Sequence, residues 1–419
     1  LLTSLDLSNN LALEEVKVYK NQISNIDLSN NLALETLSIY ENQLSDIDLS
    51  NNLNLKDLKI RYNQLSSIDL SSNTELVDLD ISHNELNQLD VSNNTKLKIL
   101  YCRANNLTDL DFTSNVVIER ILASENNLLN IEVSTNIVLK DLWLHDNSIS
   151  EIDVSNNLSL ETLYLDNNDI GSIDLSNNLF LQDLRVPGNN LIEISVIDNP
   201  ALLRLYCQDN AIETVDVSAN ANLEALRCGG NLFTEIDLSN NPLLIFFYIQ
   251  NSQLYSLDLS TNPNLAYINL IGNPWLSCLD IRNGTNELLE YFFTTDCPYL
   301  SCIDVDDPVY SGNNWTSIDP QQGFEEECNC IPVGVSEKSF EGQLSVYPNP
   351  TSGCMAIEFD QPSKGILKVY DPAGRLIQSI QVDESDRLNF EIDGITGVYL
   401  VEFLSETGAA FVEKVLKVY

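Results

Sequence analysis

The sequence predicts a mainly β protein with two parts, a solenoid of about thirteen coils of 21 residues each and a small β-sandwich that follows it. Two observations support the solenoid: one short phrase recurs every 21 residues, and apolar residues alternate with polar ones inside each copy. The sandwich is predicted by short alternating segments with turn residues between them near the C-terminus. We therefore expect a solenoid over 1–273, a C-terminal cap over 274–330, a linker over 331–343 and a second domain over 344–419.

The repeat unit reads LxxLxLxxNxLxxLDLSNNxx. Its period is followed in one apolar column: Leu5, Ile26, Ile47, Ile68, Leu89, Leu110, Ile131, Ile152, Ile173, Ile194, Val215, Ile236 and Leu257. The LxL segment indicates a short strand with one buried face, and stacked coils bury one another's leucines. The phrase LxxLxLxxN is the leucine-rich-repeat signature. With its 21-residue period, its LDLS phrase and an occasional Cys in the strand, the segment resembles bacterial surface proteins of the internalin J type.

Two columns of Asn and one of acidic residues accompany the leucines. The Asn columns, Asn21 to Asn273 and Asn10 to Asn262, are predicted to hold the turns through buried amides. The acidic column runs from Asp6 to Asp258, and Ser195 is its one gap. We expect each carboxylate to accept hydrogen bonds from the turn that follows it. The alternative is a row of Ca²⁺ sites, although the Gly-rich spacing of calcium-binding solenoids is missing.

Five of the nine cysteines lie between residues 278 and 330, which predicts disulfides and an oxidising compartment. Cys278 and Cys297 bracket one loop and Cys302 and Cys328 another, so we expect these two pairings, with Cys330 left over. The spacing fits no CxxC zinc site, and no metal is assigned. Three further cysteines occupy the inward strand column and are expected to be small buried hydrophobes: Cys102, Cys207 and Cys228.

Seven short alternating segments follow residue 343, separated by PNPTSG, DPAGR and DGITG, and favour an immunoglobulin-like sandwich. This region resembles the C-terminal sorting domain of proteins exported by the bacterial type IX secretion system. The resemblance rests on Tyr347, Pro348, Asn349, Pro350, Gly353, Asp371, Gly374, Gly397, Tyr399, Lys414 and Lys417. It implies that the translocon and sorting machinery are partners, and that the protein is secreted or displayed on the outer surface of a Gram-negative bacterium. It also commonly implies removal of the domain and attachment to lipopolysaccharide.

Composition disfavours several other classes. The formal charge of −41 argues against nucleic acid or an anionic membrane as a partner. The longest apolar run, at 243–249, is too short for a membrane span. Only His83 and His145 are present and no catalytic motif is found, so we expect no enzyme and no cofactor. The chain starts within a repeat, without Met and without a signal peptide, so we expect the N-terminal cap and export signal to lie outside it.

The outward strand positions are where the repeat varies. In residues 1–272 there are 13 basic and 38 acidic side chains, yet these outward positions are close to neutral and rich in Tyr, Trp and Arg. Such residues anchor protein interfaces. The predicted function is a surface-displayed protein-binding or adhesion module; the alternatives are a glycan-binding protein with a Tyr/Trp stripe and a structural surface component. The predicted ligand-binding residues are Tyr101, Trp143, Tyr164, Arg185, Tyr206, Arg227 and Tyr248.

Overall fold

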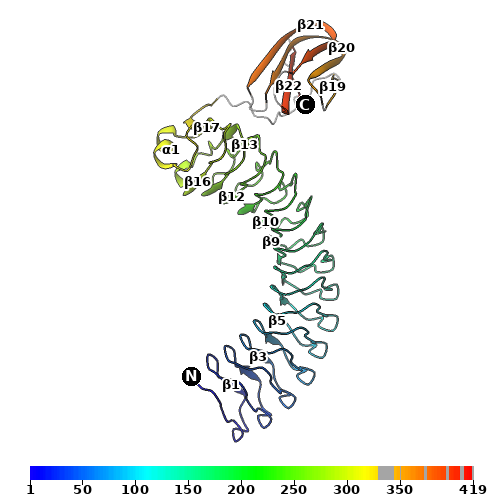
Figure 1. The fold of residues 1–419 in the computed structure, drawn as a ribbon, viewed down its shortest axis with the longest axis vertical. Coiled ribbons are helices and arrows are strands. Elements are labelled where there is room, and N and C mark those ends of the chain that lie inside the picture. Colours follow the sequence, from blue (N-terminus) through cyan, green and yellow to red (C-terminus); the bar gives the residue numbers. More distant parts are fainter. Residues whose placement is uncertain (329–343, 350, 372–374, 393–395, 406–409, 418–419) are drawn as a thin grey trace. The chain divides into compact units, whose positions relative to one another are not determined.

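The computed structural model describes residues 1–328, 344–349, 351–371, 375–392, 396–405 and 410–417 (Figure 1). The chain divides into two compact units. The first contains Leu1–Ser252, Thr261–Leu270 and Glu287–Phe292, and the second contains Gln253–Ser260, Ile271–Asn286 and Phe293–Tyr419. The linker predicted at 331–343, together with Cys330, Pro350 and Gly374, lies outside the described residues.

A parallel sheet of 14 strands runs through the leucine-rich coils, and each strand is three residues long. Along Leu1–Ser252 the strands line the inner side of the arc that the stacked coils form (Figure 1). Neighbouring strands pair in register, 21 residues apart, up to β14. The strands are β1 (Glu15–Lys17), β2 (Thr36–Ser38), β3 (Asp57–Lys59), β4 (Asp78–Asp80), β5 (Ile99–Tyr101), β6 (Arg120–Leu122), β7 (Asp141–Trp143), β8 (Thr162–Tyr164), β9 (Asp183–Arg185), β10 (Arg204–Tyr206), β11 (Ala225–Arg227), β12 (Phe246–Tyr248), β14 (Tyr267–Asn269) and β16 (Tyr291–Phe293).

The core is built from the leucine columns. In the second coil, Leu34, Leu37 and Ile39 are fully buried between the neighbouring coils, while Thr36 and Ser38 lie on the opposite side of the strand. Each buried aliphatic side chain stabilises the fold by roughly 1.5–3 kcal/mol. The inward cysteines Cys102 and Cys207 are also fully buried, and burial raises the pKa of the Cys207 thiol to about 12. They therefore pack as small hydrophobes.

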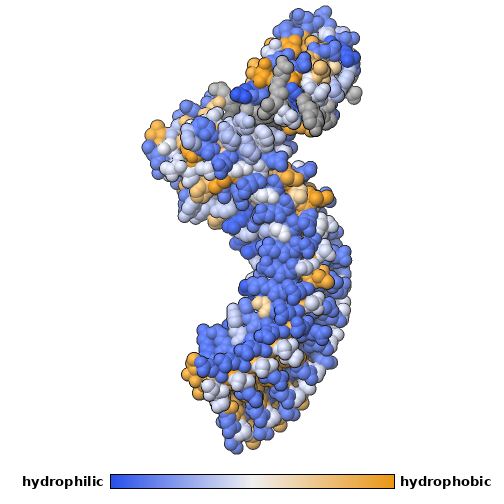
Figure 2. All heavy atoms as spheres, viewed as in Figure 1, coloured by the Kyte–Doolittle hydropathy of each residue, from blue (hydrophilic) through white to orange (hydrophobic). Residues whose placement is uncertain are grey.

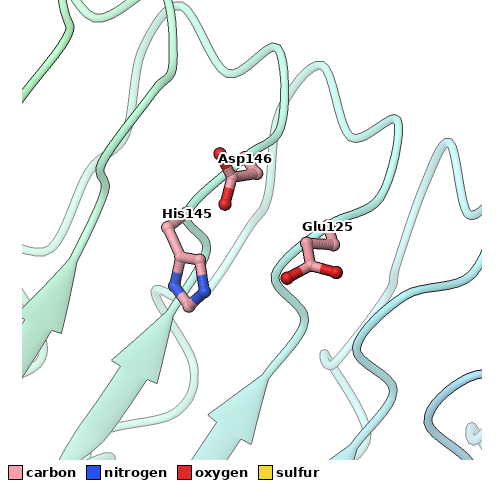
Figure 3. A group of neighbouring side chains, drawn as sticks. All are labelled: Glu125, His145 and Asp146. Atoms are coloured by element: carbon pink, nitrogen blue, oxygen red, sulfur yellow. The ribbon is translucent and has the colours of Figure 1, made fainter.

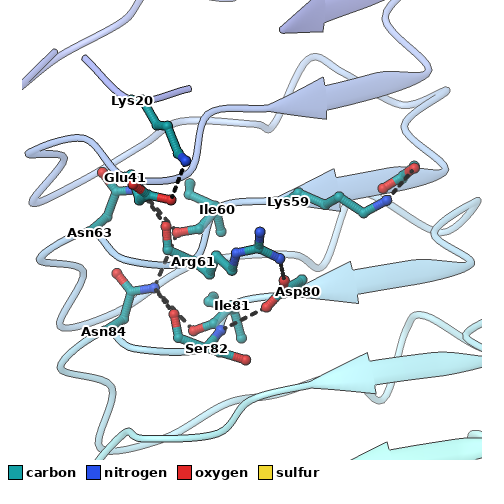
Figure 4. Close-up of polar contacts among 11 residues, drawn as sticks. Lys20, Glu41, Lys59, Ile60, Arg61, Asn63, Asp80, Ile81, Ser82 and Asn84 are labelled. Atoms are coloured by element: carbon teal, nitrogen blue, oxygen red, sulfur yellow. Dashed lines mark hydrogen bonds and ion pairs between the residues drawn. The ribbon is translucent and has the colours of Figure 1, made fainter. Parts of the chain in front are cut away.

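Each turn after a strand is held by an Asn amide that joins two coils. The Asn42 side chain accepts a hydrogen bond from the Ile23 backbone at 3.0 Å and donates to the carbonyls of Val18 and Ile39, also at 3.0 Å. The equivalent bonds recur at Asn63 and Asn84, which Figure 4 shows together with the neighbouring polar contacts. The residue just before this Asn adopts a left-handed backbone, for example Tyr62 with φ 54°. The repeat is thereby closed by the same turn in successive coils.

Parallel pairing continues beyond the last regular repeat. β16 extends the large sheet, because Glu290 and Tyr291 donate backbone hydrogen bonds to Ala266. A second parallel sheet of four strands contains β13 (Ser256–Asp258), β15 (Cys278–Asp280), β17 (Cys302–Asp304) and β18 (Gly323–Glu325). The same region holds a 3-10 turn, η1 (Asn286–Leu288), and one helix, α1 (Pro308–Asn314), which Asp307 caps. The large sheet thus has one strand more than the thirteen repeats counted in the sequence.

One of the two predicted disulfides forms. Cys302 and Cys328 are joined, which confirms that pairing. The Cys278–Cys297 pairing is wrong, because the two buried residues are not joined to each other. Cys278 opens β15 in the four-stranded sheet, whereas Cys297 follows β16 of the large sheet. The two residues are therefore held on separate strand ladders.

The C-terminal region is a curled antiparallel sheet of five strands: β19 (Leu344–Tyr347), β20 (Cys354–Tyr370), β21 (Leu376–Glu391), β22 (Gly397–Ser405) and β23 (Ala410–Lys417). The seven predicted segments merge into five strands because β20 and β21 each contain two of them. Register shifts between Glu358 and Gly365 let β20 bend while it stays paired with β21. The core of this C-terminal region includes Ile357, Leu367 and Tyr399.

Candidate ligand-binding face

Six of the seven predicted ligand-binding residues stack into one continuous row, which we call the aromatic–arginine ladder: Trp143, Tyr164, Arg185, Tyr206, Arg227 and Tyr248. Trp143 and Tyr164 stack with ring centroids 4.8 Å apart. The guanidinium carbon of Arg185 lies 4.1 Å from the Tyr164 ring centroid and 5.0 Å from that of Tyr206. Arg227 lies between Tyr206 and Tyr248 at 4.8 and 4.9 Å. The in-register strands bring these side chains together, because each is the last residue of its strand.

Hydrogen bonds to neighbouring polar side chains hold several residues of the ladder in place. Asp183, which is only 5% exposed, accepts a hydrogen bond from the Tyr164 hydroxyl at 2.9 Å and from Arg185 at 3.3 Å. Burial, followed by the Asp183 carboxylate, raises the pKa of Tyr164 to about 12. The Trp143 indole donates to Thr162 at 3.2 Å. The ring faces therefore lie against neighbouring rungs of the ladder, and these hydrogen bonds hold Trp143 and Tyr164 in place.

A hollow of about 580 Å³ opens on the same strand face, over β3 to β7. Its lining includes Tyr101 at the end of β5 and Trp143 at the end of β7, together with Arg61, Asp80 and His83. Arg61 and Asp80 form an ion pair at 2.9 Å (Figure 4), and Tyr62 and His83 stack with centroids 4.1 Å apart. Tyr101, the seventh predicted residue, thus lies in the hollow and not in the ladder.

The acidic column has a structural role in the turns. The Asp27 side chain accepts a hydrogen bond from the Ser29 backbone at 2.9 Å, and the same contact recurs for each of the other acidic residues of the column: Asp6, Asp48, Asp69, Asp90, Asp111, Glu132, Asp153, Asp174, Asp216, Asp237 and Asp258. Hydrogen bonds from Ser29 lower the pKa of Asp27, although burial and the like charge of Asp48 act in the opposite direction. These contacts explain the column without a cation.

One group of potential metal ligands occurs among the described residues. The ligand atoms of Glu125, His145 and Asp146 lie within 4.8 Å of one another (Figure 3), and His145 also lines the hollow. Both carboxylates already have partners, since Glu125 pairs with Arg103 and Asp146 accepts a hydrogen bond from Asn167 at 2.7 Å. Of the three residues, His145 lines the hollow.

A second exposed column on the solenoid surface was not predicted from the sequence. An apolar residue follows the SNN turn in many coils and is 50–63% exposed in this set, which we call the turn column: Leu11, Leu32, Leu53, Val116, Ile137, Leu158 and Leu179. The signal was an apolar residue placed directly after a polar turn. The visible surface of the coils is otherwise largely hydrophilic (Figure 2). The turn column is therefore the alternative to the strand face as a ligand-binding surface.

Residues 345–418 match the family described as the secretion system C-terminal sorting domain. The chain carries such a sorting domain at its C-terminus. The functional domain of InlJ from Listeria monocytogenes, described as including a cysteine ladder, is a similar solved structure, with 25% identity, a TM-score of 0.62, and coverage of 99% of this chain and 83% of that one. A leucine-rich-repeat protein of Leptospira interrogans (18%, 0.62, 77% and 81%) and YopM from Yersinia enterocolitica (20%, 0.52, 74% and 78%) show the same fold. No similar protein is found among curated sequences.

Several residues that suggested the sorting domain converge on its last strand. The Asn349 amide donates to the Lys414 carbonyl at 2.6 Å and accepts from the Leu416 backbone at 2.9 Å. Lys417, which is buried, donates to the Ile392 carbonyl at 2.8 Å beside Gly353. Gly397 pairs with Lys417 in the β22–β23 ladder, and Tyr399 is buried. These contacts link the two ends of the sorting domain.

Proposed function

We propose that the protein is a non-catalytic binding or adhesion protein, exported by type IX secretion to the outer surface of a Gram-negative bacterium, which recognises a protein ligand on its strand face. The sorting domain indicates a secreted or surface-attached protein. Among the described residues, no helix is long and apolar enough to cross a bilayer. The observation that carries the proposal is the aromatic–arginine ladder, a rigid row of the residue types that dominate protein interfaces, beside a hollow on the same sheet.

The ladder supports a protein ligand over a glycan. Sugar rings bind aromatic side chains through the ring faces, but the faces of Tyr164 and Tyr206 are covered by Trp143, Arg185 and Arg227. The ladder residues are partly exposed and carry hydroxyl and guanidinium groups, which can hydrogen-bond to the backbone and side chains of a protein. Glycan binding remains the second candidate, because Trp143 borders the hollow.

A binding screen of the full chain against extracellular proteins and polysaccharides tests the proposal. We expect saturable binding to a protein that weakens between 50 mM and 500 mM salt, since charged groups on the strand face contribute. Salt-independent binding to a polysaccharide would favour the glycan alternative. The absence of any ligand on either panel would favour a structural surface component.

A further inference from the structure

The aromatic–arginine ladder shows what fits between two rings that are two coils apart. Arg185 occupies the space between Tyr164 and Tyr206, and Arg227 occupies the space between Tyr206 and Tyr248. In both cases the arginine lies on the strand between the two strands that carry the rings. A guanidinium is planar and weakly hydrated, so it stacks on both faces at once.

The next such space, between Tyr101 and Trp143, holds only Leu122. These three residues pair in register on β5, β6 and β7. Leu122 is shorter than its neighbours and only 9% exposed, and the hollow lies above it, lined by all three residues. Trp143 stacks on Tyr164 on the β8 side and borders the hollow on the β6 side. The row of long outward side chains thus lacks one rung at β6.

The charges around this space favour a cation as the missing rung. The nearby cations are already neutralised, since Arg103 pairs with Glu125 and Arg120 pairs with Asp141 at 2.8 Å. Among the described residues that line the hollow, an incoming anion would meet only lysine and arginine side chains that are already paired with carboxylates, on a chain of net charge −41. An incoming guanidinium would meet aromatic rings and a favourable long-range field.

We propose that the space above Leu122, between Tyr101 and Trp143, is a socket for one arginine side chain of a basic protein partner. The proposal rests on the protein-binding function of the strand face and names the anchor that such a partner would insert. The socket lies wholly within the first compact unit. Its occupant would complete the alternation of rings and guanidinium groups that the chain itself builds from Tyr164 to Tyr248.

A probe titration of the full chain tests the socket without knowledge of the partner. N-acetyl-arginine amide is added while the indole N–H resonance of Trp143, assigned with Trp143→Phe, is followed by NMR. We expect a saturating shift with this probe and a much smaller shift with N-acetyl-lysine amide, because the ammonium is compact and strongly hydrated. A shift with N-acetyl-tyrosine amide and none with the arginine probe would overturn the proposal in favour of an aromatic anchor.

A self-filling variant supplies the second measurement. Leu122→Arg places the chain's own guanidinium between Tyr101 and Trp143, so it should abolish the probe-induced shift. Ser38→Arg, in the same column but flanked by Lys17 and Lys59, should leave the shift unchanged. Persistence of the shift in Leu122→Arg would overturn the proposal. If the strand face binds its protein ligand and Leu122→Arg leaves that affinity unchanged, the socket fails while the proposed function stands.

Discussion

At the scale of single residues, buried amides and not only leucines specify the coil. Asn168 accepts a hydrogen bond from the Ile149 backbone at 2.9 Å and donates to the carbonyls of Leu144 and Leu165, both at 3.0 Å. No apolar side chain satisfies these three backbone groups at once. An Asn at this position is therefore needed to join consecutive coils.

We predict that Asn168→Ala lowers the free energy of unfolding by about 1–3 kcal/mol, because it leaves buried backbone groups without partners. The matched control is Asn156→Ala, which makes the same chemical change at an exposed turn position of the preceding coil. Urea unfolding followed by circular dichroism measures both. Equal losses in the two variants would contradict the role assigned to the buried amide.

At the scale of structural elements, the strands of the solenoid could be predicted because the 21-residue period fixes their spacing. The 21-residue spacing placed Tyr164, Arg185 and Tyr206 on adjacent strands, and their stacking follows from in-register pairing. The hollow could not be predicted, because it depends on Leu122 being shorter than Tyr101 and Trp143 and on how those side chains turn. Outside the repeat the spacing of cysteines did not reveal which strand ladder holds each one, so the Cys278–Cys297 pairing was wrong.

The acidic column makes stability depend on pH. Hydrogen bonds from Ser50 and Ser71 lower the pKa values of Asp48 and Asp69 in the folded state. A lowered folded-state pKa gives stability that is present above the unfolded pKa of about 4 and is lost as the pH falls through the folded value. We therefore predict that the melting temperature is constant from pH 7 to 5 and falls below about pH 4.

The control for this prediction keeps the hydrogen bonds and removes the charge. The control variant combines Asp48→Asn, Asp69→Asn and Asp90→Asn. Because an Asn side chain still accepts the amide hydrogen bonds, the melting temperature of this variant should fall less steeply below pH 4. Calorimetry at half-unit pH intervals measures both proteins. A melting temperature that rises as the parent is acidified would show that relief of charge repulsion dominates instead.

Gly353 in the sorting domain adopts a backbone conformation that residues with a side chain rarely adopt. Its φ is +129°, and an added Cβ would lie 3.4 Å from the Ile392 carbonyl oxygen. We predict that Gly353→Ala destabilises the sorting domain by about 1 kcal/mol or more and speeds hydrogen exchange in β20 and β23. Gly312→Ala is the control, because its Cβ would meet only Phe324 at 3.9 Å. Unchanged exchange in Gly353→Ala would refute the assignment of strain.

At the scale of the whole molecule, recognition and export are expected to be separable. The strand face belongs to the first compact unit, and the family match to the sorting domain is confined to residues 345–418. The described contacts that hold the aromatic–arginine ladder lie between β7 and β12. Loss of the sorting domain should therefore leave the ladder intact.

We predict that deletion of residues 344–419 in a host with type IX secretion traps the protein in the periplasm in a folded state. Fractionation and protease accessibility of whole cells measure the location, and circular dichroism of the purified product measures the fold. Another type IX substrate in the same cells serves as the export control. Surface display of the truncated chain at the parental level would contradict the prediction.

The binding role of the strand face is tested most directly by comparing two triple variants for affinity toward the ligand from the binding screen. The ladder variant interrupts the aromatic–arginine ladder with Trp143→Ala, Arg185→Glu and Tyr206→Ala. The turn-column variant changes the exposed turn column with Ile137→Ser, Leu158→Ser and Leu179→Ser. We predict that the ladder variant keeps its circular dichroism spectrum, melts a few degrees lower through the lost stacking, and binds at least tenfold more weakly. The turn-column variant should bind like the parent. Full affinity in the ladder variant with lost affinity in the turn-column variant would contradict the account and move the binding surface to the turns.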